Sequence, residues 1–330
     1  MKIIVTGCLG FIGINFVNFI LKNKKDIKVL GIDNLTYASN KFYLTKLIKN
    51  KNFSFVKLDI SSKKIESAIN SFKPNKLINF AAESHVDNSI NSPEKFIKTN
   101  INGVYNLLHF SNKYYQKLNF EKRKHFLFLQ ISTDEVYGSL TSGIADENSK
   151  YNPSSPYSAS KASADHLVNA WQKTYNLPTI ITNTCNNFGP FQNKEKFIPT
   201  IISSILNNKN IPLYGNGENI REWIFVEDHV RIIYLLLKKG KIGEKYNIGS
   251  NIRISNLKLI KKIINNYGKN HKDIELPNLL KKIKFVKDRL GHDQRYAINS
   301  KKVLSLIKYQ NLTDIDRGLK KTIDWYIKNL

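Results

Sequence analysis

A threonine and two carboxylic acids stand next to each other in the middle of this chain, at Thr133, Asp134 and Glu135. They follow an apolar run, residues 126–129, that is typical of a buried strand in a parallel sheet. Ligands of open α/β sheets bind beyond the carboxyl ends of such strands. We therefore predict that these three side chains lie where chemistry is done.

A tyrosine and a lysine four residues apart, Tyr157 and Lys161, form a second possible reactive group. Residues 158–171 contain no Gly or Pro, which predicts a helix, and on a helix the two side chains share one face. An ammonium group near a phenol lowers the phenol pKa, so Tyr157 would be a general base near neutral pH. Because this spacing also occurs by chance at protein surfaces, the pair predicts function only together with other motifs.

The N-terminus supplies such a motif. A short strand-like run leads into Gly7, Gly10 and Gly13, then into an apolar helical segment and a second strand-like run that ends at Asp33. The glycines allow a tight turn, close approach of the backbone to a pyrophosphate, and packing of the helix on the sheet. Asp33 is placed to hydrogen-bond an adenosine ribose and would repel a 2′-phosphate, so the motif predicts NAD rather than NADP.

Strands and helices alternate along the first half of the chain, and these elements must position the motifs. We expect strands at 53–58, 77–82, 126–131 and 179–184, with a long helix at 94–117. This alternation predicts an α/β fold with a Rossmann-type doubly wound parallel sheet.

The alternation loosens beyond about residue 180, which predicts a smaller α/β substrate-binding domain. We expect an NAD-binding Rossmann domain at 1–180 and a mainly substrate-binding domain at 181–330. Part of 216–250 is expected to pack back on the first domain.

The charge of the chain raises one rival function. A formal net charge of +26 suggests a polyanionic partner such as nucleic acid. However, the Lys residues are scattered through every segment, and no helix-turn-helix, zinc-finger or RNA-binding aromatic motif is present. Arg, whose planar fork suits phosphates and guanines, is scarce. We therefore expect no nucleic-acid partner.

The cysteines and the apolar runs exclude other classes. Cys8 and Cys185 provide neither a disulfide framework nor a metal-ligand cluster. The longest clear apolar run, 232–237, is too short to span a bilayer, and a strand-like run begins at Lys2 in place of a signal peptide. We expect a cytoplasmic protein with no metal and no membrane contact.

Together these residues resemble the extended short-chain dehydrogenase/reductase family, and within it the sugar-nucleotide dehydratases that act on dTDP-glucose. The resemblance covers nearly the whole chain. Its most specific motif is Thr-Asp-Glu at 133–135, because related epimerases and decarboxylases generally lack the acidic pair. The matching stretches are Gly7–Gly13, Asp33–Ala38, Ala81–Asp87, Ser132–Gly138, Tyr151–Lys161, Asn186–Pro190, Glu195–Pro199 and Asp288–Asp293.

The resemblance implies a hydro-lyase reaction that yields dTDP-4-keto-6-deoxyglucose and regenerates the cofactor. Tyr157 takes the C4 hydroxyl proton while NAD takes the C4 hydride, with Thr133 on that oxygen and Lys161 tuning Tyr157. Glu135 then takes the C5 proton, Asp134 protonates the leaving C6 hydroxyl, and the hydride returns to C6. In an extended strand Asp134 and Glu135 would point to opposite faces, so both can serve one sugar only if the strand ends near Thr133.

Binding residues also carry over from the glycine motif and from the resemblance. The residues expected at NAD are Gly7, Gly10, Phe11, Ile12, Gly13, Asp33, Asn34, Leu35, Thr36, Asp59, Ile60, Phe80, Ala81, Ala82, Ser84, Thr99, Tyr157, Lys161 and Asn187. The residues expected at the dTDP-glucose substrate are Ser84, Thr133, Asn186, Lys196, Phe197, Pro212, Leu213, Tyr214, Arg221, Asn256, Asp288, Arg289 and His292.

Three positions depart from the family pattern without removing a chemical group. Cys8 replaces a usual Gly, Ile14 a common Ser, and Phe188 a usual Tyr. Cys8 would lie near the phosphates at a helix N-terminus, a position that lowers a thiol pKa, but we expect it to be an inert small residue.

Substrate choice and assembly follow less directly. Sequence poorly separates thymine from uracil, so the alternative is a dehydratase or epimerase acting on UDP-glucose or another sugar nucleotide. The family usually dimerises through two helices per subunit, here 94–117 and 157–175, so we expect a homodimer.

Overall fold

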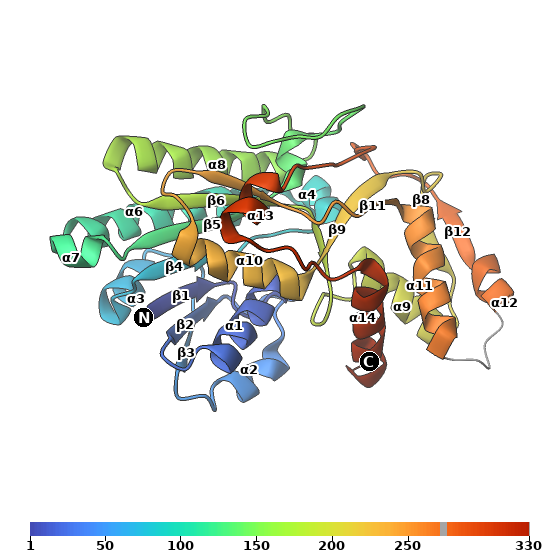
Figure 1. Ribbon diagram of the computed structural model, residues 1–330, viewed down its shortest axis with the longest axis horizontal. Helices are drawn as coiled ribbons and strands as arrows, with labels where there is room; N and C mark the ends of the chain where they lie inside the picture. The colour runs from blue at the N-terminus through green and yellow to red at the C-terminus, as the bar shows by residue number, and fades with distance from the viewer. Residues whose placement is uncertain (271–275, 330) are drawn as a thin grey trace.

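The computed structural model describes residues 1–270 and 276–329, which form two lobes (Figure 1). The larger lobe is built on a seven-stranded sheet, and the smaller lobe contains a three-stranded and a two-stranded sheet. Among the residues described, no helix is both long enough and apolar enough to cross a membrane.

The large sheet consists of β1 (Lys2–Thr6), β2 (Lys28–Asp33), β3 (Phe53–Lys57), β4 (Lys76–Asn79), β5 (Leu127–Thr133), β6 (Thr179–Thr184) and β10 (Lys245–Ile248). Its order is β10-β6-β5-β4-β1-β2-β3, and all pairs are parallel. From β1 the chain adds β2 and β3 on one side of the sheet, and it then crosses to the other side of β1 to add β4, β5 and β6. This reversal between β1 and β4 is the switch point at which doubly wound proteins bind ligands. The predicted fold class is confirmed.

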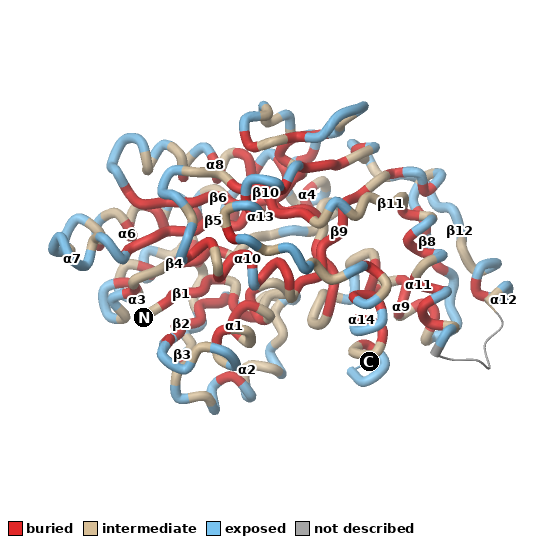
Figure 2. Tube along the Cα trace, viewed as in Figure 1, coloured by how far each residue is buried: buried red, intermediate tan, exposed pale blue. Residues whose placement is uncertain are grey.

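Helices cover both faces of this sheet because successive strand residues face opposite ways. Ile3 and Val5 pack in one buried cluster, and Ile4 packs in another. The strands form the buried centre in Figure 2. The cluster of Ile3 and Val5 includes α1 (Phe11–Asn23), α2 (Lys41–Leu47), α10 (Val226–Lys239) and α13 (Lys301–Ile307). The cluster of Ile4 includes α3 (Ile65–Phe72), α6 (Val104–Gln116) and α8 (Pro156–Tyr175). The shorter helices of this lobe are α4 (Val86–Asn91), α5 (Pro93–Phe96) and α7 (Phe120–Arg123).

The smaller lobe has its own core, which includes Trp223, Leu259 and Leu319. One sheet joins β7 (Asn186–Phe188), β9 (Ile220–Phe225) and β11 (Arg253–Ser255). The other joins β8 (Ile211–Tyr214) and β12 (Ile283–Val286). The helices are α9 (Phe197–Leu206), α11 (Asn256–Asn270), α12 (Leu276–Lys281) and α14 (Ile315–Asn329).

The second half of the chain contributes to both lobes. β10 pairs with β6 at one edge of the large sheet, and α10 packs against α1. Segments 226–239 and 245–248 therefore lie with the large sheet. A boundary at 180/181 stays a prediction.

Two elements differ from those expected. The helix predicted at 94–117 is α5, then a π-helical segment, η1 (Ile97–Gly103), then α6. The π-helical turns contain the buried Asn100, whose amide binds the Glu83 backbone and the Ser160 hydroxyl. π-Helical turns of this kind often occur at functional sites. The strand predicted at 77–82 ends at Asn79, so residues 80–82 form a loop beside the glycine turn.

Candidate active site

The Thr-Asp-Glu motif lies at the end of a central strand. β5 ends at Thr133, and residues 134–137 form a 3₁₀ turn. The Thr133 hydroxyl accepts from the Glu135 N–H at 3.2 Å and donates to Asp134 Oδ1 at 3.3 Å. Because the strand stops at Thr133, the two acids are not held in strict strand alternation. The condition for a shared role of Asp134 and Glu135 is therefore met.

Tyr157 and Lys161 lie in the first turns of α8, as predicted. Pro156 occupies the first helical position, and Ser155 and Ser158 form a reciprocal capping box, which fixes where the helix begins. The Lys161 ammonium donates to the carbonyl oxygen of Ile131 in β5 at 2.6 Å. The helix start is thus joined to the strand that carries Thr133.

The predicted acidification of Tyr157 by Lys161 is absent from the protein alone. Burial and the charge of Glu135 raise the pKa of Tyr157, and a hydrogen bond with Thr133 only partly offsets them. Burial lowers the pKa of Lys161 to about 8. The Lys161 ammonium is held by a backbone carbonyl, and burial and the charge of Glu135 dominate the shift in the Tyr157 pKa.

Asp134 and Glu135 have different surroundings. Burial, followed by the charges of Glu135 and Glu222, raises the pKa of Asp134 well above its ordinary value. Its Oδ2 is buried and has no hydrogen-bond partner among the described residues. Burial also raises the pKa of Glu135, but nearby cations oppose this. Neighbouring carboxyls in unlike environments are typical of an acid paired with a base.

Three cations from the smaller lobe act on Glu135: Arg289, Arg221 and Lys196. Arg221 is 4% exposed, and its guanidinium donates to the backbone carbonyls of Ile220, Asp293 and Gln294. Its side chain is therefore held inside the small lobe and does not form an ion pair at the surface. Arg289 is more open, and its Nε has no partner among the described residues. Arg289 is therefore the freer of the two arginines for an anionic ligand.

The glycine turn after β1 fits a dinucleotide. Gly7 has a φ of +63°, and a Cβ there would stand 2.6 Å from the Ala81 nitrogen. A Cβ on Gly13 would stand 2.1 Å from the Gly7 oxygen, so this glycine closes the turn against the helix. At Gly10 the nearest atom would be 3.4 Å away, and Gly10 borders an open pocket. The helix N-terminus beside this pocket favours phosphate.

That pocket contains much of the predicted NAD set. Asp33 lies in it, and its carboxylate accepts from Leu9 N, Leu35 N and the Ser39 hydroxyl, which leaves part of its acceptor capacity for a ribose. The predicted residues that line it are Gly7, Gly10, Asp33, Asn34, Thr36, Asp59, Ile60, Phe80, Ala81, Ala82 and Thr99. Those outside it are Phe11, Ile12, Gly13, Leu35, Ser84, Tyr157, Lys161 and Asn187. The lining residues that sequence reasoning missed are Ile32, Ala38, Ser39, Leu58 and Glu83.

Cys8 does not face this pocket. Its side chain is fully buried, and its sulfur packs against Gly31. A Cβ built on Gly31 would stand only 2.7 Å from this sulfur. Burial raises the pKa of the thiol, so the lowering expected from the helix N-terminus is wrong. A protonated, buried thiol agrees with the inert residue we expected.

Predicted substrate residues in β8 alternate along the strand. Pro212 and Tyr214 are exposed, whereas Leu213 packs in the core of the small lobe and offers only its backbone. Tyr214 donates to Asp87 Oδ2 at 3.3 Å, and Lys196 donates to the Ser84 carbonyl at 2.8 Å. These two contacts join the lobes and bring both predicted substrate groups toward the end of β4.

The other predicted substrate residues also come from the small lobe. His292 contacts Asp288 at 2.5 Å and lies edge-on to Tyr214. Phe197 stacks on Trp223, Asn256 is buried at the start of α11, and Asn186 begins β7. Asn187, predicted at NAD, bonds His229 and the Cys185 carbonyl through its amide, so its side chain is already engaged.

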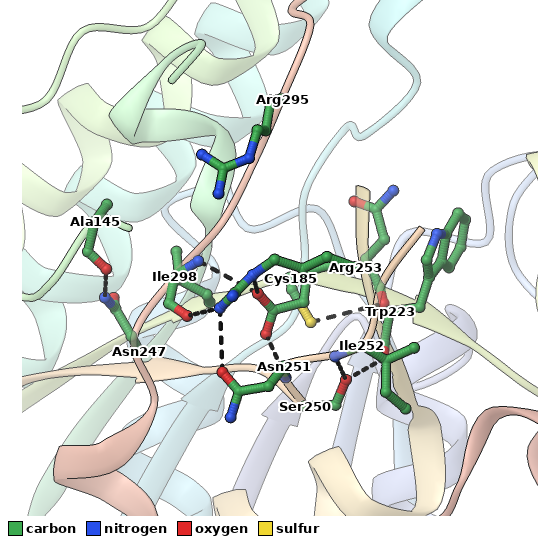
Figure 3. Close-up of polar contacts among 12 residues, drawn as sticks. Ala145, Cys185, Trp223, Asn247, Ser250, Asn251, Ile252, Arg253, Arg295 and Ile298 are labelled. Atoms are coloured by element: carbon green, nitrogen blue, oxygen red, sulfur yellow. Dashed lines mark hydrogen bonds and ion pairs between the residues drawn. The ribbon is translucent and has the colours of Figure 1, made fainter. Parts of the chain in front are cut away.

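A buried ion pair supports the strand that carries Arg221. Glu222 is fully buried and accepts from Arg253 Nε at 2.9 Å. Arg253 also donates to Asn251 Oδ1 and to the Ile298 carbonyl, as Figure 3 shows. This cluster joins β9, β11 and the chain after Asp293, and so fixes the small lobe beside Asp134.

Sequence reasoning missed a polar cluster behind the predicted catalytic residues. Asp165 is buried on α8 and accepts from Ser132, Tyr151 and Asn183. The available signal was its spacing, because Asp165 follows Lys161 by the same four residues that separate Lys161 from Tyr157.

Comparison with known proteins identifies the family. The family model described as GDP-mannose 4,6 dehydratase matches residues 4–322. A dTDP-glucose 4,6-dehydratase of Haemophilus influenzae is 43% identical, covering 100% of this chain and 98% of its own. A Neisseria meningitidis protein of the same name is 43% identical, covering 99% and 94%.

Solved structures match the whole fold. The dTDP-glucose 4,6-dehydratase of Bacillus anthracis, in complex with NAD, has a TM-score of 0.86 at 40% identity and covers 100% of this chain and 97% of its own. The Streptomyces venezuelae enzyme, also with NAD, has a TM-score of 0.90 at 36% identity and covers 100% and 98%. The chain therefore belongs to the nucleotide-sugar 4,6-dehydratase family, in which these full-length relatives are dTDP-glucose 4,6-dehydratases.

Proposed function

We propose that the protein converts dTDP-glucose to dTDP-4-keto-6-deoxyglucose by oxidation at C4, loss of water across C5 and C6, and reduction at C6. The observation that carries this proposal is the unlike pair at the end of β5. Burial and the charges of two carboxylates raise the pKa of Asp134 well above its ordinary value, whereas Arg289, Arg221 and Lys196 oppose the rise in the pKa of Glu135. Elimination of water needs such an acid and such a base on one sugar.

NAD is the cofactor we propose, held by the glycine turn, Asp33 and the pocket between β1 and β4. When bound, NAD supplies the hydride acceptor and donor, and its positive nicotinamide ring favours ionisation of a nearby phenol.

The residues of the chain divide the proton transfers. Tyr157 takes the C4 hydroxyl proton, and Thr133, which hydrogen-bonds Tyr157, holds the same oxygen. The resulting C4 ketone acidifies the C5 proton, which Glu135 removes and later returns. Asp134 gives its proton to the C6 hydroxyl as it leaves as water. Lys161, fixed by the Ile131 carbonyl, provides positive charge beneath the tyrosine.

The substrate nucleotide would lie against the small lobe. The partly exposed Arg289, whose buried Nε has no hydrogen-bond partner among the described residues, suits the diphosphate, and the exposed Pro212 and Tyr214 suit the base. His292 and Asp288 border the same strand. The remaining predicted residues, Asn186, Phe197 and Asn256, lie at the starts of β7, α9 and α11.

Product formation tests the reaction and the base preference together. Purified protein is incubated in parallel with dTDP-glucose and UDP-glucose, and the absorbance of the 4-keto product is read after addition of alkali. We expect product from dTDP-glucose without added NAD, because the cofactor is regenerated in each cycle. Product from UDP-glucose alone would favour the alternative substrate, and a C4 epimer without the keto sugar would contradict the dehydratase assignment.

A homodimer is the assembly we propose. Aromatic side chains of α6 and α8 form one surface, in which Tyr105 contacts His109 and Trp171, and Trp171 contacts Tyr175. Tyr105 and Tyr175 are 43% and 45% exposed. An exposed cluster of large aromatic rings often marks a surface that binds another protein. Pairing of these helices with their copies would cover them.

Two further assignments complete the proposal. A cytoplasmic location suits the two buried cysteines, Cys8 and Cys185, which are free thiols. We propose that the NAD-binding domain comprises 1–180 together with 226–248, and that the rest of 181–330 mainly binds substrate.

A further inference from the structure

A buried carboxylate that the proposed proton transfers do not use lies directly behind them. Asp165 is 0% exposed and stands one helical turn after Lys161 on α8. Its Oδ2 accepts from Ser132 Oγ at 2.7 Å, from Tyr151 OH at 3.1 Å and from Asn183 Nδ2 at 3.2 Å. Three donors directed at one oxygen suit a carboxylate. Oδ1 is buried without a hydrogen-bond partner among the described residues, and burial raises the pKa of Asp165, while the charge of Lys161 and these donors oppose that rise.

The donors are joined to the backbone that carries the catalytic groups. Ser132 immediately precedes Thr133 at the end of β5. Asn183 Nδ2 also donates to the Thr133 carbonyl at 3.3 Å. One residue earlier, the Ile131 carbonyl accepts from Lys161. Asp165 therefore ties the last turn of the strand to the helix that presents Tyr157 and Lys161.

The charges around Asp165 give it a second effect. Lys161 is buried with no carboxylate in ion-pair contact among the described residues, and Asp165 is the group whose charge favours its ammonium form. The other titratable groups that face Asp165 are Tyr157 on the same helix, Tyr151, Tyr137 and Lys245. The phenols are neutral, so Lys161 and Lys245 are the cations on which this carboxylate acts.

We propose that Asp165 is a positioning residue: it anchors the Ser132–Thr133 strand end through its hydrogen bonds and supplies the negative charge that keeps Lys161 protonated. This inference rests on the proposed dehydratase reaction, because Lys161 has its role there. It predicts that the charge of Asp165, and not only its shape, sets the pH range of the enzyme.

The test is Asp165→Asn, with Asp324→Asn as the matched control at an exposed carboxylate of α14. The rate of 4-keto product formation from dTDP-glucose is measured across pH, together with thermal unfolding. Loss of the negative charge favours neutral Lys161, so Lys161 loses its proton at lower pH. We expect the alkaline side of the pH–rate profile, its alkaline limb, to shift to lower pH by about one unit, which is the usual size of the effect of a nearby charge on a pKa. The control should leave the limb where it is.

A second variant separates anchoring from charge. Ser132→Ala removes one hydrogen bond and keeps the carboxylate, so the rate should fall while the alkaline limb stays in place. The wild-type profile must come first, because a wild type without product would contradict the proposed function and not this inference. With an active wild type, an unmoved limb in Asp165→Asn overturns the proposal. So does Asp165→Asn protein that fails to fold, because Asn keeps the shape and can accept the same hydrogen bonds.

Discussion

At the scale of single residues, the two arginines near Glu135 differ in how much of their hydrogen bonding is already used. Arg221 is buried, stacks on Tyr296 at 4.2 Å and donates to three backbone carbonyls. Arg289 is only partly buried, and its Nε, which is buried, has no hydrogen-bond partner in the described part of the chain. The family resemblance predicted both at the substrate, and their packing now distinguishes an arginine bonded to the backbone from one that is less engaged.

Arg289→Gln should weaken substrate binding, because a charged hydrogen bond to a diphosphate contributes about 1–3 kcal/mol. We expect KM for dTDP-glucose to rise about 10- to 100-fold with a smaller change in kcat. Arg221→Lys should instead lower the melting temperature, since Lys cannot bond the three carbonyls at once. Steady-state kinetics and thermal unfolding of both variants check this. An unchanged KM in Arg289→Gln would rule out its contact with the diphosphate.

At the scale of elements, the glycine turn separates packing from ligand approach. A Cβ on Gly13 would meet the Gly7 oxygen at 2.1 Å, whereas a Cβ on Gly10, a residue that lines the pocket, would meet nothing closer than 3.4 Å. Gly13→Ala should therefore lower the melting temperature by several degrees, because the turn and helix must move apart.

Gly10→Ala should keep the wild-type melting temperature in the absence of NAD and bind NAD more weakly. Isothermal titration with NAD after removal of the bound cofactor measures this. Equal NAD affinities for wild type and Gly10→Ala would mean that the pyrophosphate does not approach this glycine.

These elements also show how far sequence reasoning reaches. Periodicity and glycine spacing predicted the strands, the turn and α8 because local chain chemistry sets them. The π-helical turns at 97–103 escaped prediction because the buried contacts of Asn100 cause them. Asp165 escaped for the same reason, since its partners Ser132 and Asn183 are distant in sequence. The raised pKa of Tyr157 is caused mainly by burial, which the four-residue spacing of Tyr157 and Lys161 does not reveal.

At the scale of the whole molecule, the two lobes meet over the site. Tyr37 of the large lobe donates to Glu195 at 3.2 Å, and the Lys196 and Tyr214 contacts described above lie beside it. The residues proposed as acids and bases come from the large lobe, whereas the cations that act on Glu135 come from the small one. Both lobes therefore contribute to the reaction we propose.

The exposed aromatic surface of α6 and α8 predicts the assembly. Tyr105→Glu would bring two carboxylates together across the proposed twofold contact, so sedimentation velocity should show a monomer where the wild type is a dimer. Phe42→Glu, at a residue 89% exposed on α2, is the matched control and should remain dimeric. If Tyr105→Glu sediments like the wild type, this surface is not the dimer contact.

The fate of the C5 proton tests the central claim most directly. If Glu135 removes and returns that proton, reaction of the wild-type enzyme with dTDP-glucose in deuterated water should place one deuterium at C5 of the 4-keto-6-deoxy product. The hydrogen newly placed at C6 should come from substrate C4. Glu135→Gln should turn over about 10²- to 10⁴-fold more slowly, the usual contribution of a general base. Mass spectrometry and proton NMR of the product locate the label. Deuterium at C5 with strongly reduced turnover of Glu135→Gln is the predicted result, whereas deuterium at C4, or a Glu135→Gln enzyme as fast as the wild type, would contradict it.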